Sequence, residues 1–138
     1  MTVRRGRREW SKSRCWPARE LVTRYRAAMA SGDRPKARAA LADDLHFKGP
    51  IDEFHRADDY VAALSKLATI VKAIENTKTF ASGDEVAVIY DMVTSTPAGT
   101  VTIAEWYRVE AGRIVEIRAI FDSRPFAGLF PPRAPESA

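Results

Sequence analysis

Apolar residues at the spacing of an amphipathic helix dominate the first half of the chain. In the first such segment they are Leu21, Tyr25, Ala28 and Met29. Because Pro17 suits a first helical position and Gly32 a helix end, a helix is predicted between them. A second, short helix is predicted from Asp33, its expected N-cap, to about Leu41.

A short strand and a third helix are predicted next. Residues 45–48 read as a strand, and residues 51–56 read as a loop. Either Asp58 or Asp59 is the expected N-cap of the third helix. The apolar face of this helix is expected to contain Val61, Leu64, Leu67 or Ala68, and Val71.

The second half of the chain has apolar residues at the period of two that is typical of strands. Four strands are predicted, the first with the weakest signal, over residues 72–81, 85–95, 100–110 and 113–122. Turns rich in glycine separate them and favour hairpins. From Ser123 the chain is rich in proline and is predicted to be irregular. Helices followed by hairpin-linked strands predict an α+β fold with a largely antiparallel sheet.

Length and charge indicate one domain with a basic leader. The chain has 138 residues, which is the size of one ordinary domain. Residues 1–19 hold seven of the 22 basic residues but one of the 18 acidic residues. We therefore expect a disordered basic leader over residues 1–16, a domain over 17–126 and an irregular tail over 127–138. Because the domain itself is slightly acidic, a nucleic-acid partner is not expected, and a leader that tethers nucleic acid is the weaker hypothesis.

Other residue types narrow the class of protein further. A single cysteine, Cys15, excludes an internal disulfide and fits the reducing cytoplasm. No apolar run is long enough for a bilayer, so no membrane partner is expected. We also expect no cofactor, because there is no glycine-rich phosphate loop or dinucleotide fingerprint. One cysteine and two histidines do not give a structural zinc pattern, so no metal is expected either.

Three segments resemble nuclear transport factor 2-like domains of the SnoaL-like kind. They are RYRAAMASGDRPKARAALADDLHFKGP, EVAVIYDMV and EWYRVEAGRIVEIRAIFD. The likeness covers about residues 18–126. It implies a cone, in which a strongly curved, mostly antiparallel sheet wraps on three helices and encloses a pocket. Members of this superfamily are often dimers and include ketosteroid isomerases, polyketide cyclases, limonene epoxide hydrolases, dehydratases and non-catalytic domains, so the fold does not settle the function.

The resemblance does not carry over either well-understood catalytic pattern. The general-base position of the ketosteroid isomerases falls on Gly49, although Tyr25 matches their tyrosine. The catalytic aspartate of the limonene epoxide hydrolases falls on Ala119. Of that second set Asp91 alone is present, so neither mechanism is transferred.

Two carboxylates on apolar strand faces are the candidate catalytic residues. Strand alternation places Glu105 on the face of Ile103 and Tyr107, and Asp91 on the face of Ile89. A carboxylate in an apolar cavity has a raised pKa, which a general acid or a near-neutral base needs. Tyr107 or Tyr25 would then donate to a developing oxyanion. The alternatives for Glu105 are a structural ion pair or a solvated position at the sheet edge, and the alternative for Tyr25 is a core position. For Asp91 the choice of face stays open, because both faces of its strand are apolar.

His46, Tyr107 and Phe121 are the candidate substrate-binding residues. His46 points away from the face of its two apolar neighbours, so a solvent position is the alternative. His55 lies in a charged loop, and a histidine–carboxylate metal site stays open because the spacing is not diagnostic. An outer sheet face is expected to make a homodimer, because an apolar sheet face rarely stays bare. The candidate residues of that face are Tyr90, Met92 and Trp106.

These features leave two hypotheses of different kinds. In the first, the protein is an enzyme of the cyclase, isomerase or dehydratase type that does acid–base chemistry on a hydrophobic small molecule. In the second, it is a non-catalytic ligand-binding or dimerisation module. Replacing Glu105 with glutamine would abolish turnover under the first hypothesis and leave function intact under the second.

Overall fold

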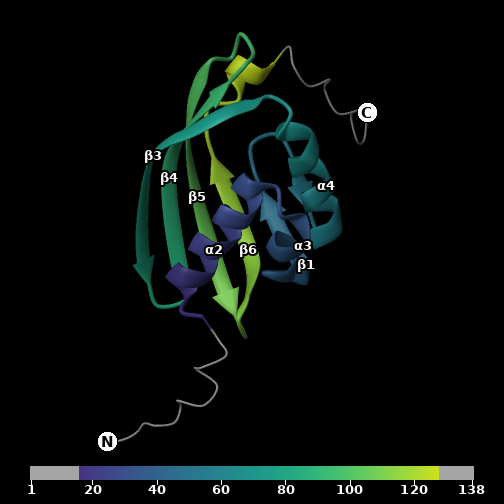
Figure 1. The fold of residues 1–138 in the computed structure, drawn as a ribbon, viewed down its shortest axis with the longest axis vertical. Helices are drawn as coiled ribbons and strands as arrows, with labels where there is room; N and C mark the ends of the chain where they lie inside the picture. The colour runs from purple at the N-terminus through teal and green to yellow at the C-terminus, as the bar shows by residue number, and fades with distance from the viewer. Residues whose placement is uncertain (1–15, 128–138) are drawn as a thin grey trace, which may run out of the picture.

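A curved sheet with helices on one side makes up the described chain, residues 16–127 of this computed structural model (Figure 1). The helices are α2 (Ala18–Ser31), α3 (Arg34–Ala39) and α4 (Ala57–Leu67). The strands are β1 (Leu41–Lys48), β2 (Glu53–Phe54), β3 (Val71–Ser82), β4 (Glu85–Thr94), β5 (Thr100–Glu110) and β6 (Arg113–Ile120). A 3-10 helix, Arg124–Phe126, follows the last strand. The predicted α+β fold is confirmed, while the expectations for residues 1–15 and 128–138 lie outside the described part of the chain.

The sheet is open and mostly antiparallel. Its strand order is β2-β1-β6-β5-β4-β3, and β1 pairs with β6 in parallel while the other neighbours are antiparallel. Figure 1 shows the long strands curving around α2, with α3 and α4 beside β1. This arrangement leaves one concave face of the sheet directed at the helices.

Local chemistry explains the first two helices. Gly32 ends α2 with a left-handed φ of 80°, which glycine adopts at little cost. Its N–H bonds to the carbonyls of Ala28 and Met29. The predicted N-cap Asp33 is confirmed, because its side chain accepts a hydrogen bond from the N–H of Lys36.

Tertiary pairing moves three element boundaries away from the sequence prediction. The strand β1 begins at Leu41 rather than 45, because Leu41 pairs with Ile114 of β6. Part of the predicted loop 51–56 forms β2 against the end of β1. Val71, predicted on the third helix, instead begins β3 opposite Thr94. In each case pairing with a neighbouring strand outweighs the local pattern.

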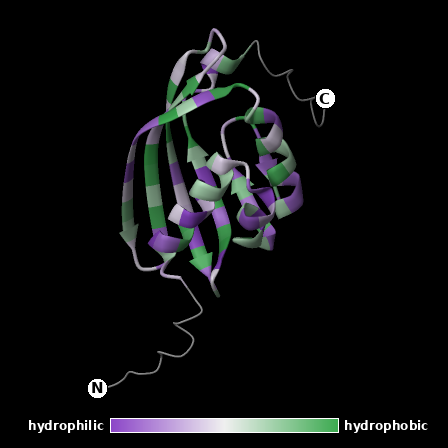
Figure 2. Cartoon of the chain, viewed as in Figure 1, coloured by the Kyte–Doolittle hydropathy of each residue, from purple (hydrophilic) through white to green (hydrophobic). Residues whose placement is uncertain are grey.

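The apolar core lies between the concave face and the helices. Figure 2 shows apolar and polar residues alternating along the strands, as a half-buried sheet requires. The fully buried side chains include Val86, Val88, Tyr107, Ile114 and Ile117.

Two of the residues expected on the outer sheet face are core residues. Tyr90 and Met92 are buried on the concave face, whereas Trp106 lies on the outer face as expected. The segment after Ser123, predicted to be irregular, also joins the core, because Phe126 is buried against Phe121. None of the helices in the described part of the chain is both long and apolar enough to cross a membrane.

Candidate functional site

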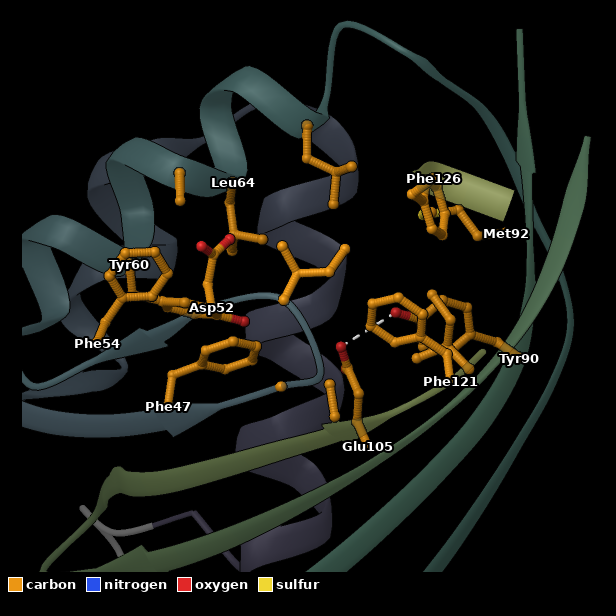
Figure 3. A pocket seen from close by; sticks show the side chains of 16 residues that line it. Phe47, Asp52, Phe54, Tyr60, Leu64, Tyr90, Met92, Glu105, Phe121 and Phe126 are labelled. Atoms are coloured by element: carbon orange, nitrogen blue, oxygen red, sulfur yellow. Dashed lines mark hydrogen bonds between the residues drawn. The ribbon is translucent and has the colours of Figure 1, made fainter. Parts of the chain in front are cut away.

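An apolar cavity of about 130 Å³ lies between α4, the turn after β1 and the concave face of the sheet. Figure 3 shows aromatic rings on several sides of it. Those rings belong to Phe47, Phe54, Tyr60, Tyr90, Phe121 and Phe126. Two carboxylates, Asp52 and Glu105, also line it. The predicted substrate-binding position of Phe121 is therefore at the cavity wall.

A larger, more open hollow of about 410 Å³ adjoins this cavity beside α2. Tyr25, Arg26 and Tyr107 line this second hollow. The residues common to both are Tyr60, Leu64, Leu67, Tyr90, Met92 and Glu105. Glu105 therefore stands where the two spaces meet.

Three donors hold the Glu105 carboxylate. Its Oε1 accepts a hydrogen bond from Nη1 of Arg26 at 2.8 Å and another from the hydroxyl of Tyr107. Its Oε2 accepts a hydrogen bond from the hydroxyl of Tyr90 at 3.1 Å. The side chain of Glu105 is 12% exposed and that of Arg26 is 21% exposed. A carboxylate on this apolar face was expected to need a partner or a proton, and Arg26 is that partner.

Arg26 reaches this position from α2. Its guanidinium lies 4.3 Å from the centroid of the Tyr90 ring and donates to the Tyr107 hydroxyl at 3.0 Å. Burial acts to lower the pKa of Arg26, but Tyr107 and Glu105 outweigh burial and raise this pKa above its ordinary value. The site therefore contains a fixed cation beside a fixed carboxylate.

The phenols around Glu105 are neutral hydrogen-bond donors. Burial is the largest cause that raises the pKa above the ordinary tyrosine value at Tyr25, Tyr60, Tyr90 and Tyr107. Tyr90 and Tyr107 both donate to Glu105. Tyr25 instead donates to the hydroxyl of Tyr60 at 3.4 Å, and its ring packs edge-on against Tyr107. The structure thus brings Tyr25, Tyr107 and Glu105 together. Tyr107 bonds to the carboxylate directly, whereas Tyr25 contacts Tyr107 and Tyr60.

Asp91 does not share this environment. It lies on the outer face of β4, where Oδ1 accepts from Thr102 at 2.6 Å and Oδ2 accepts from Asn76 at 2.8 Å. These hydrogen bonds lower the pKa of Asp91. The expectation of a carboxylate with a raised pKa in an apolar cavity is therefore wrong for Asp91, and the pairing of Asp91 with Glu105 as acid and base has no geometric support.

His46 lies outside the cavity. Its Nε2 is 2.7 Å from Oε2 of Glu53, and its ring stacks on that of His55. Strand alternation explains this position, because the neighbouring Phe47 takes the face that lines the cavity.

The pattern of residues 22–117 matches the family model described as a SnoaL-like domain. The chain belongs to this family. Comparison with curated proteins gives no match. The match to the family model confirms the predicted resemblance, and the solved structures described next share the fold.

Several solved structures share the SnoaL-like fold. An NTF2-like protein from Cytophaga hutchinsonii is 26% identical, with a TM-score of 0.70 over 80% of this chain and 94% of that one. A putative polyketide cyclase from Pseudomonas putida is 16% identical, with a TM-score of 0.70 over 84% and 99%. An LEH-like epoxide hydrolase from M. tuberculosis is 22% identical, with a TM-score of 0.65 over 81% and 88%. The last two likenesses concern the fold alone.

Two positions at the wall of the SnoaL-like cavity correspond to catalytic carboxylates of the ketosteroid isomerases and the limonene epoxide hydrolases, and here both residues are small and apolar. They are Gly49 and Ala119. A Cβ at Gly49 would lie 3.1 Å from the ring of Phe47 and 3.7 Å from the Cβ of Ala119. Any side chain at Gly49 would therefore require the Phe47 ring to shift slightly.

Sequence reasoning missed three polar residues of the SnoaL-like site. Arg26 is one residue beyond the apolar stripe of its helix, and Tyr90 was assigned to the other face of its strand. Asp52 lies in the predicted loop, held by a hydrogen bond from the N–H of Gly49 to its carbonyl at 2.9 Å. Figure 3 shows the Asp52 carboxylate directed into the cavity. An acidic residue two positions after Pro50 is the one sequence signal that could have indicated it.

Proposed function

We propose that this SnoaL-like protein binds a hydrophobic small molecule in the cavity, with a hydrogen-bond donor of that molecule at Glu105. The observation that carries the proposal is a charge-compensated carboxylate at the wall of an apolar cavity. Ligand pockets are mostly apolar with a few fixed polar groups that orient the ligand.

The acceptor capacity of Glu105 defines the ligand's polar end. A carboxylate oxygen accepts two hydrogen bonds, and Oε1 already has two donors, Arg26 and Tyr107. Among the described residues Tyr90 alone donates to Oε2, so Oε2 has room for one more donor. A hydroxyl or N–H group on an apolar skeleton fits this arrangement. The adjoining hollow beside α2 would accept a skeleton longer than the first cavity holds.

Acid–base catalysis is the second candidate function, and Asp52 is the observation that favours it. The Asp52 carboxylate faces the cavity and has no side-chain hydrogen bond or ion pair within residues 16–127. The Asp52 oxygens are therefore free to meet a substrate, whereas the Glu105 carboxylate already accepts hydrogen bonds from Arg26, Tyr90 and Tyr107. In an isomerase, cyclase or dehydratase type of reaction, Asp52 would take a proton from the substrate. The Tyr90 hydroxyl could stabilise a developing oxyanion only by turning its one proton from Glu105 to the substrate.

Native mass spectrometry of the protein purified from cells tests the binding proposal. Extra mass that is lost on denaturation is the expected result, and Leu64→Trp, which fills the cavity wall, should remove it. Ala62→Trp, on the exposed side of the same helix, is the matched control and should keep the mass. A wild-type chain without added mass that also fails to bind hydrophobic alcohols in calorimetry would refute the proposal.

Two conservative variants separate binding from catalysis once a ligand is known. Glu105→Gln should weaken ligand affinity by about 10-fold or more, since hydrogen bonds to charged groups contribute about 1.5–3 kcal/mol. Asp52→Asn should leave affinity within a few-fold and abolish turnover. Turnover that survives in Asp52→Asn would overturn the catalytic role of Asp52 and leave the binding proposal standing.

We also propose that the outer sheet face makes a homodimer. Its cross-strand rows carry exposed or half-buried apolar side chains: Ile89, Ala104 and Ile120 in one row, and Phe80, Ala87 and Trp106 in the next. Ile120 is 70% exposed and Phe80 is 56% exposed. An apolar sheet face of this kind is typical of an interface between two copies. In light scattering Ile120→Glu should give monomers and Arg34→Glu, on exposed α3, should not; a monomeric wild type would contradict the proposal.

A further inference from the structure

A histidine–glutamate–histidine cluster lies on the hairpin of β1 and β2, on the side away from the cavity. Nε2 of His46 lies 2.7 Å from Oε2 of Glu53, and Nε2 of His55 lies 3.6 Å from the same oxygen. All three ligand atoms lie within 4.8 Å of one another. Two imidazoles and a carboxylate therefore lie close together on this surface.

The backbone pairing fixes this convergence. In β1 and β2, Phe47 pairs with Phe54 and Lys48 with Glu53. The same register places His46 opposite His55, and their rings stack at 4.9 Å with an interplanar angle of 8°. Glu53 is two residues before His55 and so shares its face. The cluster thus has the geometry of a cross-strand pair plus its diagonal neighbour.

The opposite face of the hairpin anchors these strands. The Phe47 ring stacks on that of Tyr60 at 4.7 Å, and the Phe54 ring lies 6.3 Å from it. The three polar side chains therefore extend from a backbone that the core holds in place. Metal sites on such rigid elements require little rearrangement of the chain.

We propose that His46, Glu53 and His55 bind a divalent metal ion of the zinc type. Imidazole nitrogen and carboxylate oxygen are ligands that zinc takes at about 2.0–2.2 Å, so donor atoms around a tetrahedral zinc ion lie about 3.3 Å apart. The two separations from Glu53, 2.7 and 3.6 Å, lie on either side of that value. Because the two imidazole rings are stacked almost parallel, at least one of them has to rotate out of the stack to complete the site, and the exposed His55 side chain is free to do so; solvent would take the fourth position.

A second carboxylate supports the orientation of His46. Glu116 of β6 is the strand partner of His46, and its Oε2 lies 3.9 Å from Nδ1 of that ring. A carboxylate on the nitrogen that does not face the metal is the usual outer partner of a metal-binding histidine. Arg108 and Arg118 compensate the Glu116 charge. At 3.9 Å the contact is longer than a hydrogen bond, so Glu116 would act as a positioning residue once the His46 ring turns toward it.

A zinc titration of the full chain without a polyhistidine tag, measured by isothermal calorimetry, tests this site. The expected result is one zinc ion per chain, with a rise in Tm on zinc addition. His55→Ala should remove both effects, and this variant should fold because the His55 side chain is 74% exposed. Glu116→Gln should weaken zinc binding by about 10-fold through the orientation of His46.

Two control variants make the assignment specific. Cys15→Ser removes the single thiol of the chain, and Glu75→Gln removes an exposed carboxylate of β3. Both should bind zinc as the wild type does. The proposal is overturned if zinc does not bind, if His55→Ala binds it unchanged, or if Cys15→Ser loses it. Absence of zinc binding would mean that the cluster is a hydrogen-bonded histidine–glutamate pair only, and would leave the cavity proposal untouched.

Discussion

Replacing Arg26 with methionine tests whether the Glu105 carboxylate depends on its cation. Methionine keeps most of the alkyl packing but removes the ion pair at 2.8 Å. Removing one partner of a buried pair costs about 3–5 kcal/mol, because the other charge stays buried without compensation. Tyr90 and Tyr107 would still donate to Glu105, and both side chains of the pair are slightly exposed. We therefore expect a loss near the lower limit, about 3 kcal/mol of unfolding free energy.

The reverse substitution should cost less. In Glu105→Gln the guanidinium keeps its place over the Tyr90 ring and its hydrogen bond to Tyr107. We expect a loss of about 1.5–2 kcal/mol, in the lower part of the range of about 1.5–3 kcal/mol that a hydrogen bond to a charged group contributes. The double variant leaves no unpaired charge, so its loss should be smaller than the sum of the two single losses by about 1.5 kcal/mol or more.

Urea denaturation at pH 7 measures all three variants, with Arg19→Met on an exposed position of the same helix as the control. The control should change the unfolding free energy by no more than about 0.5 kcal/mol. A loss below about 1 kcal/mol, or single losses that simply add, would refute the reasoning that Arg26 is what makes a carboxylate tolerable on this face.

Three further predictions concern local features. Asp33→Ala removes the acceptor for the Lys36 N–H and should lower the unfolding free energy by about 1 kcal/mol in urea denaturation. Gly32→Ala should lower it by about 1–2 kcal/mol in the same assay, because its φ is 80° and the space around it is open, so the cost is backbone strain alone. Hydrogen bonds from the side chain and backbone of Arg124 lower the pKa of Asp122 to about 2. Since the folded pKa is depressed, the stabilisation is present above the ordinary pKa of about 4 and is lost as the pH falls through about 2. Acid titration of Arg124→Gln should show a smaller component, because the side-chain hydrogen bonds are lost and the backbone N–H still donates to Asp122.

The order and type of the elements were predictable because their signals are local. Helical spacing, the N-cap Asp33 and the helix end at Gly32 depend on residues a few positions apart. The boundaries that moved depend instead on partners far along the chain. Leu41 begins β1 because it meets Ile114, and no residue near Leu41 reports that contact.

The assignment of sheet faces succeeded on β5 and failed on β4 for a physical reason. On β5 one face carries Thr102 and Arg108, so the apolar face with Glu105 was identifiable as the inner one. On β4 both faces are rich in apolar residues, because the outer face is itself an exposed apolar surface with Ile89. Alternation separates two faces but does not say which one meets the core. Asp91 was therefore predicted on the inner face and Tyr90 on the outer face, and the structure has the reverse.

The ion pair at the centre of the site was not predictable from either of its members. Arg26 and Glu105 are 79 positions apart, and they meet because α2 lies across the concave face of the sheet. A charged residue beside an apolar helix stripe usually faces solvent. The carboxylate on an apolar strand face was the detectable half, since it required some partner, and only the fold identifies that partner as Arg26.

The β1–β2 hairpin shows how one alternating pattern produces two different surfaces. Its inner face places Phe47 and Phe54 at the cavity, and its outer face places His46 and His55 against each other. Reading residues 51–56 as a loop removed the pairing, so the two histidines had no reason to be neighbours. Once the pairing is present, the phenylalanine and histidine positions follow from the same register. A ligand in the cavity and a metal ion on the outer face would therefore contact the same hairpin. Each of them should protect the backbone amides of β1 and β2 from hydrogen exchange.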